Sequence, residues 1–136
     1  MGKNESCNIE LVDIDKIKPI ENFCPHRVEK VKDDILKNNW IHPVVLFFNK
    51  KDNLYHVLDG HHRSEIAKLL CLKKIPAIII EDYFQVKIRS LRDEIKISHK
   101  KVIDRSINGN IYPYKTVKHD FDFELPELNI KISDLD

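Results

Sequence analysis

The residues best suited to chemistry form one short run, Asp59-Gly60-His61-His62-Arg63. An apolar strand pattern ends before this run, the glycine permits a tight turn, and a helical pattern follows. Free backbone N–H groups and the helix dipole make such a helix N-terminus an anion site. The two histidines and the arginine add donors that suit phosphate oxygens. The run therefore predicts a phosphate site, with Asp59 placed to hold Mg²⁺ or to orient a hydroxyl group.

A helix cap is the plain alternative for the same residues. Aspartate commonly caps a helix, and glycine is common at the same position. Each residue taken alone favours the cap. The five residues together, at a strand-to-helix turn, favour a ligand site.

The surrounding sequence predicts a single domain of the α/β (α+β) class, with a small mixed sheet and flanking helices. Unbroken apolar runs indicate covered strands, and apolar residues at helical spacing indicate amphipathic helices. We expect strands at 9–12, 43–48, 55–58, 75–80 and 84–88, an additional edge strand at 129–132, and helices at 25–39, 62–72 and 100–107. The second helix should turn Leu69 inward and bury Cys71, and Asn108-Gly109 should end the third.

Composition narrows the class of protein. The 136 residues fit one domain, and the net charge of +1 provides no global basic field that would hold nucleic acid. No helix-turn-helix pattern follows the core, so a nucleic-acid partner is not expected. No apolar run approaches the roughly 18–20 residues that cross a bilayer, and the N-terminus is polar, so we expect a cytoplasmic protein without a membrane partner.

The cysteines and the other histidines give no sign of a metal site. Cys7, Cys24 and Cys71 are odd in number and lack a CxxC spacing, which indicates reduced thiols. Four further histidines have no metal-ligand spacing among themselves, and we expect them on the surface or in packing positions: His26, His42, His56 and His99.

The Asp59–Arg63 run, followed by Lys74-Ile75-Pro76-Ala77, resembles the ParB/sulfiredoxin-like superfamily. Sulfiredoxins carry a catalytic cysteine in the equivalent turn, and ParB proteins carry a Gly-Glu-Arg-Arg-like turn that holds CTP. The Asp-Gly-His-His-Arg form is closest to the free serine kinases, which phosphorylate L-serine to O-phosphoserine. The resemblance spans roughly 9–120, which predicts the domain there, a flexible N-terminus at 1–8 and a tail at 121–136 that packs on or beside it.

Two further segments resemble the serine kinase branch. In Ile17-Lys18-Pro19-Ile20-Glu21, Glu21 takes the place of the catalytic base, although the family's histidine before it is isoleucine here. We expect Glu21 in an exposed loop. Downstream, the resemblance implies that Lys115, Thr116, Lys118 and His119 bind serine and the phosphoryl group. Val117 and Lys118 replace the family's threonine and arginine, and the region 83–111 is shorter than in the family.

The resemblance implies a nucleotide-dependent kinase that uses Mg²⁺, takes ATP or ADP as phosphoryl donor, and phosphorylates L-serine or a similar small hydroxyl compound. The alternative is a non-catalytic ParB-like nucleotide-binding or DNA-associated regulatory module with the same phosphate site. A two-metal nuclease would need a carboxylate cluster, and only Asp59 is in place. The kinase hypothesis requires Glu21 and the segment 115–119 to line the same cleft as His61.

Overall fold

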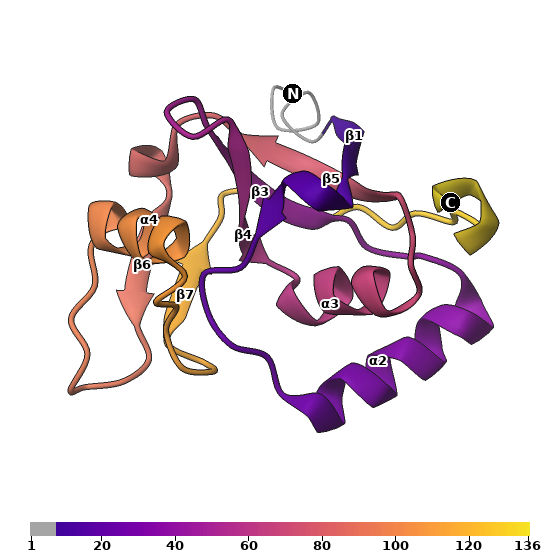
Figure 1. Ribbon diagram of the computed structural model, residues 1–136, viewed down its shortest axis with the longest axis horizontal. Helices are drawn as coiled ribbons and strands as arrows, with labels where there is room; N and C mark the ends of the chain where they lie inside the picture. Colours follow the sequence, from indigo (N-terminus) through magenta and orange to yellow (C-terminus); the bar gives the residue numbers. More distant parts are fainter. Residues whose placement is uncertain (1–7) are drawn as a thin grey trace.

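A five-stranded mixed sheet forms the centre of the computed structural model, which describes residues 8–136 (Figure 1). Met1 to Cys7, with most of the predicted flexible N-terminus, lie outside the described residues. The strand order is β1-β5-β3-β4-β2, and its strands are β1 (Ile9–Asp13), β2 (Ile17–Lys18), β3 (Val44–Asn49), β4 (Leu54–Asp59) and β5 (Lys74–Ile80). β3 runs parallel to β5 and antiparallel to β4, and β2 runs parallel to β4. The apolar run of β3 is buried on both faces, as predicted for a central strand.

Two helices, α2 (Pro25–Asn38) and α3 (His61–Leu69), pack against each other below the sheet in Figure 1. Proline at the first turn of α2 suits a helix start, since that N–H has no partner within the helix. Ile35 of α2 and Ile66 of α3 join Trp40 and Ile75 in one core beside the sheet. This core holds α3, and therefore its N-terminus, at the end of β4.

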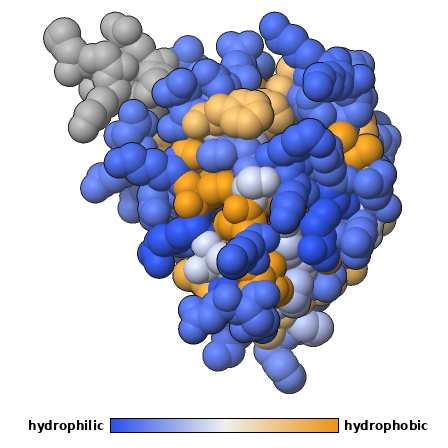
Figure 2. Space-filling model, turned by 90° about the vertical axis from the view of Figure 1, so that its left-hand side faces the viewer, coloured by the Kyte–Doolittle hydropathy of each residue, from blue (hydrophilic) through white to orange (hydrophobic). Residues whose placement is uncertain are grey.

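A second core lies beside α4 (His99–Asn108) and the two-stranded antiparallel sheet of β6 (Lys87–Ser90) and β7 (Val117–Asp120). Gly109, in the left-handed conformation, ends α4 as predicted. Apolar side chains reach the surface on the side of the molecule where α4 lies (Figure 2). Tyr83, Tyr112 and Val102 are buried in this core, so it anchors the downstream half of the chain.

The structure corrects several boundaries. The predicted strand at 84–88 is a 3-10 turn at Tyr83–Gln85 followed by β6, because buried Tyr83 draws the chain into the core first. The predicted edge strand at 129–132 reduces to one bridge between Trp40 and Ile130, after which a 3-10 helix, Ile132–Leu135, packs Leu135 into the first core. The short strand β7, Val117–Asp120, was not predicted.

The end of α3 was also predicted wrongly. The helix stops at Leu69, which is 56% exposed, and Cys71 is exposed in a left-handed conformation. The Leu72 N–H donates to the Ala67 carbonyl oxygen, which closes a turn after the helix and directs Leu72 inward instead. Along residues 8–136, no helix has both the length and the apolar character needed to cross a membrane.

The turn from β4 into α3 requires glycine at position 60. Gly60 has φ +97°, a conformation that L side chains rarely adopt. A Cβ atom there would lie 2.7 Å from Val44 Cγ1 and 3.0 Å from Arg63 Nη2. Gly109 has φ +76° but faces open space. The two glycines therefore separate the cost of the backbone conformation from the cost of the close contact.

We predict that Gly60→Ala destabilises the fold by about 2–4 kcal/mol, as the left-handed backbone and overpacking against β3 both contribute. Gly109→Ala is the matched control and should cost only the backbone part, about 1–2 kcal/mol. Urea unfolding of both variants measures the difference. Equal losses in the two proteins would contradict the close contact at Gly60.

Candidate active site

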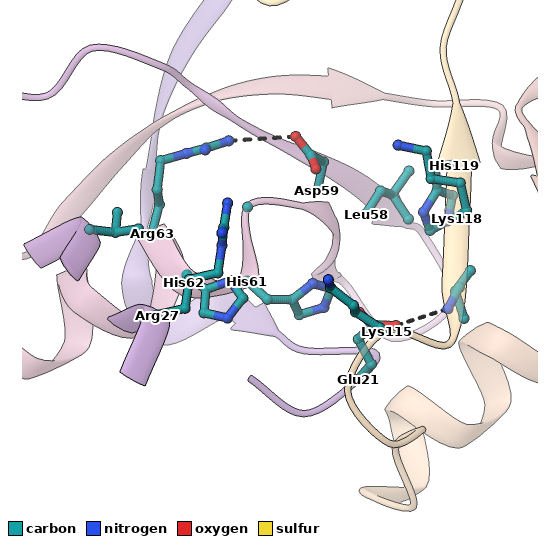
Figure 3. A pocket seen from close by; sticks show the side chains of 13 residues that line it. Glu21, Arg27, Leu58, Asp59, His61, His62, Arg63, Lys115, Lys118 and His119 are labelled. Atoms are coloured by element: carbon teal, nitrogen blue, oxygen red, sulfur yellow. Dashed lines mark hydrogen bonds and ion pairs between the residues drawn. The ribbon is translucent and has the colours of Figure 1, made fainter. Parts of the chain in front are cut away.

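A cavity of about 370 Å³ lies at the N-terminus of α3 (Figure 3). It brings together residues that are far apart in the chain, as the kinase hypothesis required. Every predicted site residue except Thr116 lines it. The lining consists of Glu21, Arg27, Val31, Leu58, Asp59, Gly60, His61, His62, Arg63, Lys115, Val117, Lys118 and His119.

The N-terminus of α3 carries cationic and histidine side chains where acidic ones are usual. Gly60 is the N-cap residue and supplies no side-chain cap, and the first turn holds no acidic residue. Because the helix dipole disfavours cations at this end, the arrangement favours an anion at the first turn. Asp59 is not the capping residue, so the helix-cap interpretation does not explain it.

Arg27 is a pocket residue that the sequence reasoning missed. It lies in the first turn of α2, whose N-terminus also lacks an acidic residue. The sequence did contain a signal for it, because a basic residue in the first turn of a helix opposes the helix dipole and so indicates a nearby anion. Figure 3 shows Arg27 beside His62, so a second helix start adds positive charge to the same cavity.

Arg63 braces the turn as well as lining the pocket. Its Nη2 donates to the Pro43 carbonyl oxygen at 3.1 Å and lies 3.5 Å from Asp59 Oδ2. The Nε atom is buried without a partner among the described residues. Burial lowers the pKa of the guanidinium, and the Asp59 carboxylate opposes that shift. Arg63 therefore pairs with Asp59 and braces the turn, and its side chain also lines the cavity.

His61 and His62 are held as neutral rings. The Ile20 N–H donates to His61 Nε2 at 3.2 Å, and the Cys24 N–H donates to His62 Nε2 at 3.1 Å. Burial lowers the pKa of His61 to about 3, with smaller contributions from neighbouring positive charge. Burial also lowers the pKa of His62. Both rings line the cavity as hydrogen-bonding groups rather than as cations.

Glu21 connects the upstream segment to the downstream one. Its Oε2 accepts hydrogen bonds from the Thr116 N–H at 3.1 Å and the Val117 N–H at 2.9 Å. The expectation of an exposed loop was wrong, since Glu21 is half-buried. Burial raises the pKa of its carboxyl group, although hydrogen bonds from backbone amides oppose the shift. A raised pKa suits a proton acceptor.

The downstream segment contributes unequally to the cavity. Lys115 and Lys118 line it, whereas the Thr116 side chain is buried and its hydroxyl donates to the Pro113 carbonyl oxygen at 2.7 Å. The structure therefore does not bring the Thr116 hydroxyl into the pocket. His119 lines the pocket from β7, and burial lowers its pKa to about 4.

Tyr83 is a second residue that the sequence did not point to. Its hydroxyl lies 2.7 Å from His119 Nε2, and both side chains are buried. Burial raises the pKa of Tyr83, so the hydroxyl keeps its proton. Tyr83 lies in a 3-10 turn with no motif, which left no local signal for this contact.

The acidic side chains fit a magnesium ion that is bound together with phosphates. Among residues 8–136, no group of three or more His, Cys, Asp and Glu side chains is close enough to hold a metal by itself. Mg²⁺ usually takes one or two carboxylates plus phosphate oxygens and water. Asp59, whose side chain is 49% exposed, offers one such carboxylate in the pocket.

Residues 1–100 match the family model of the ParB N-terminal domain, and the chain belongs to that family. An ATP-dependent L-serine kinase of Staphylothermus marinus is 36% identical over 80 residues, which cover 58% of this chain and 31% of the relative. A probable chromosome-partitioning protein ParB of Rickettsia prowazekii is 32% identical over 80 residues, covering 55% and 26%. The chain thus spans less than a third of the length of these curated relatives.

Among solved structures, a free serine kinase in complex with AMP matches with a TM-score of 0.87 at 14% identity. The match covers 96% of this chain and 94% of that chain. At this identity the likeness establishes the fold. The family match confirms the predicted ParB-like relationship, and the structural match confirms the mixed α/β fold class.

We predict that the His61 and His119 rings do not titrate near the ordinary histidine value of about 6.5. Their folded-state pKa values, about 3 and about 4, lie below that value. The unfolded chain therefore binds protons first on acidification. The stability from these rings is complete above pH 6.5 and declines as the pH falls, until it is lost near the folded pKa values. NMR titration of the ring C–H signals should give midpoints below about 5. A midpoint of 6 or above for either ring would contradict this result.

Proposed function

We propose that this chain is a nucleotide-dependent kinase that transfers a phosphoryl group to the hydroxyl of free L-serine, or of a similar small hydroxyl compound. The observation that carries the proposal is the position of Glu21, which lines the same cavity as the anion-binding N-terminus of α3. A kinase needs a base for the acceptor hydroxyl and a site for the donor phosphates. Here a carboxylate with a raised pKa would be the base, and the start of α3 beside it would bind the phosphates. The named activity of the Staphylothermus marinus relative supports the proposal.

The donor phosphates would bind at the start of α3. Backbone N–H groups after Gly60, the neutral imidazoles of His61 and His62, and the guanidinium of Arg63 offer hydrogen bonds to their oxygens. Arg27 adds charge from α2. Four cationic side chains in the lining face two carboxylates, which gives the cavity the positive balance that a polyphosphate requires. ATP and ADP both fit this description.

The acceptor would bind between Glu21 and β7. Lys115 and Lys118 provide positive charge for a serine carboxylate, and His119 lies beside Leu58 at the end of β4. In this proposal Thr116 contributes its backbone N–H, which orients Glu21, and not its hydroxyl.

In the transfer step, Glu21 accepts the proton of the serine hydroxyl as the oxygen bonds to phosphorus. The bond from that phosphorus to the bridging oxygen breaks at the same time, and ATP leaves as ADP, or ADP as AMP. A magnesium ion held by Asp59 and the phosphates would neutralise charge on the donor. Arg63 holds Asp59 in place for that purpose.

A non-catalytic nucleotide-binding module is the second candidate. The two amide hydrogen bonds to Glu21 Oε2 would give this residue a purely structural reason to lie in the pocket. The match to the Rickettsia prowazekii ParB covers a similar share of the chain. This candidate predicts nucleotide binding without transfer, so an assay for phosphoserine separates the two.

We predict that Arg63→Ala weakens nucleotide binding by about 1.5–3 kcal/mol, the scale of a charge-assisted hydrogen bond. Arg89→Ala is the control, because Arg89 is 60% exposed on β6 and pairs with Asp120 outside the cavity. Isothermal titration with ATP and with ADP measures both. Unchanged affinity in a folded Arg63→Ala protein would remove Arg63 from the phosphate site.

For Glu21→Gln we predict a loss of roughly 10²- to 10⁴-fold in phosphoserine formation with nearly unchanged nucleotide affinity. Glutamine can still accept the two amide hydrogen bonds but cannot take the proton. In the parent, the acid limb of the rate profile should lie above the ordinary glutamate range, since the pKa is raised and the base must be ionised. Glu10→Gln, an exposed acid on β1, is the control. A Glu21→Gln rate close to the parent's would favour another base, and nucleotide binding without any phosphoserine in the parent would favour the binding module.

A further inference from the structure

The two histidines of the phosphate site hold the segment that carries Glu21. His61 Nε2 accepts the N–H of Ile20, and His62 Nε2 accepts the N–H of Cys24. The segment Ile20–Cys24 is thereby fastened to the first turn of α3 on both sides of Glu21. Neither contact was evident from the sequence motif, in which the histidines count only as phosphate donors.

These contacts determine where each ring carries its proton. A backbone N–H can only donate, so each Nε2 must present its lone pair. A neutral imidazole with an unprotonated Nε2 carries its hydrogen on Nδ1. Both rings are therefore the Nδ1–H form. Protonating Nε2 would place an N–H against another N–H and push the segment away from α3.

The surroundings keep both rings in that neutral form. Burial is the main cause for His61, and the positive charge of Lys68 acts in the same direction. Burial is also the main cause for His62, and the cationic side chains of Arg27, Arg63 and Lys115 add to it.

The same segment is fastened on its other side. The Asn22 N–H donates to the Tyr112 carbonyl oxygen at 2.9 Å, and the Tyr112 N–H donates to the Ile20 carbonyl oxygen at 3.1 Å. Glu21 Oε2 also accepts hydrogen bonds from the backbone N–H groups of Thr116 and Val117. Segment Ile20–Cys24 thus lies between the two histidines and the segment 112–117. Loss of the hydrogen bonds on one side would leave Glu21 held only by those on the other.

We propose that His61 and His62 are positioning residues for Glu21: their Nε2 atoms fix segment Ile20–Cys24 against α3, while their Nδ1–H groups remain neutral donors for a ligand phosphate. The role of Glu21 as base rests on the proposed function, but the hydrogen bonds and the tautomers do not. The phosphate site and the base are then coupled through two imidazole rings, so a change at either histidine alters transfer as well as donor binding.

A pair of substitutions separates the two roles of His61. In His61→Gln, the side-chain amide oxygen can reach the position of Nε2 and still accept the Ile20 N–H. In His61→Asn, the shorter side chain places its amide near the Nδ1 position and leaves the Ile20 N–H without an acceptor. His26→Gln is the control, because His26 is exposed in α2 and does not line the cavity.

Two measurements need no enzymatic activity. Long-range ¹H–¹⁵N correlation of the histidine rings should show His61 and His62 protonated at Nδ1 and unprotonated at Nε2. Hydrogen exchange of the Ile20 amide should be slow in the parent and in His61→Gln, and about tenfold faster in His61→Asn, as expected for one lost hydrogen bond. A ring protonated at Nε2, or equal Ile20 exchange in both variants, would overturn the proposal.

The kinetic measurement then tests the coupling. At saturating donor, kcat should fall at least about tenfold further in His61→Asn than in His61→Gln, because a misplaced base slows transfer. Equal kcat values, with only the donor affinity changed, would reduce the histidines to phosphate contacts and overturn the positioning role. If the parent protein makes no phosphoserine, the proposed function fails, and the tautomer and exchange results still decide whether the histidines hold the segment.

Discussion

The pocket depends on how the carboxylate of Glu21 is held. Its Oε2 accepts hydrogen bonds from two backbone amides that lie 95 and 96 positions away in the chain, and this contact places the segment after β2 beside the start of β7. A carboxylate bonded in this way cannot move freely, so the cavity acquires a fixed acidic group among the cationic side chains that line it.

A buried polar network holds the chain just before Glu21. Ser106 of α4 donates to the Pro19 carbonyl oxygen at 2.8 Å, two residues before Glu21. His56 of β4 lies 2.6 Å from the Ser106 hydroxyl and 2.9 Å from Asp52. His56 is fully buried, and burial lowers its pKa, so a satisfied network of this kind rigidifies the core rather than exposing a reactive group. Through it, α4 sets the path of the chain that enters the pocket.

The parts of the site that the sequence predicted well are those whose information is local. In the Asp59–Arg63 run, strand end, glycine and donors are contiguous, and the structure places all of them at one helix start. The helices were predictable because apolar residues recur at helical spacing over several turns. The central strands were predictable because their apolar runs are unbroken. β7 has only four residues, too short for a period-two pattern to stand out.

The remaining features arise from contacts between distant residues. Nothing near Glu21 in the sequence reveals its bond to Thr116, and nothing near Tyr83 reveals its contact with His119. The prediction that Leu69 and Cys71 are buried was wrong for a similar reason. Helical spacing shows which side of a helix is apolar, but it does not show where the helix ends. Arg27 was missed since its partner surface, the start of α3, is formed only in the folded chain.

The most direct measurement is a crystal structure of this chain with ADP and L-serine bound. We expect the ADP phosphates to bind the backbone N–H groups at the start of α3, with the serine hydroxyl within hydrogen-bond reach of Glu21. A nucleotide bound with its phosphates away from α3, or serine bound outside the cavity that Glu21 and His61 share, would contradict it.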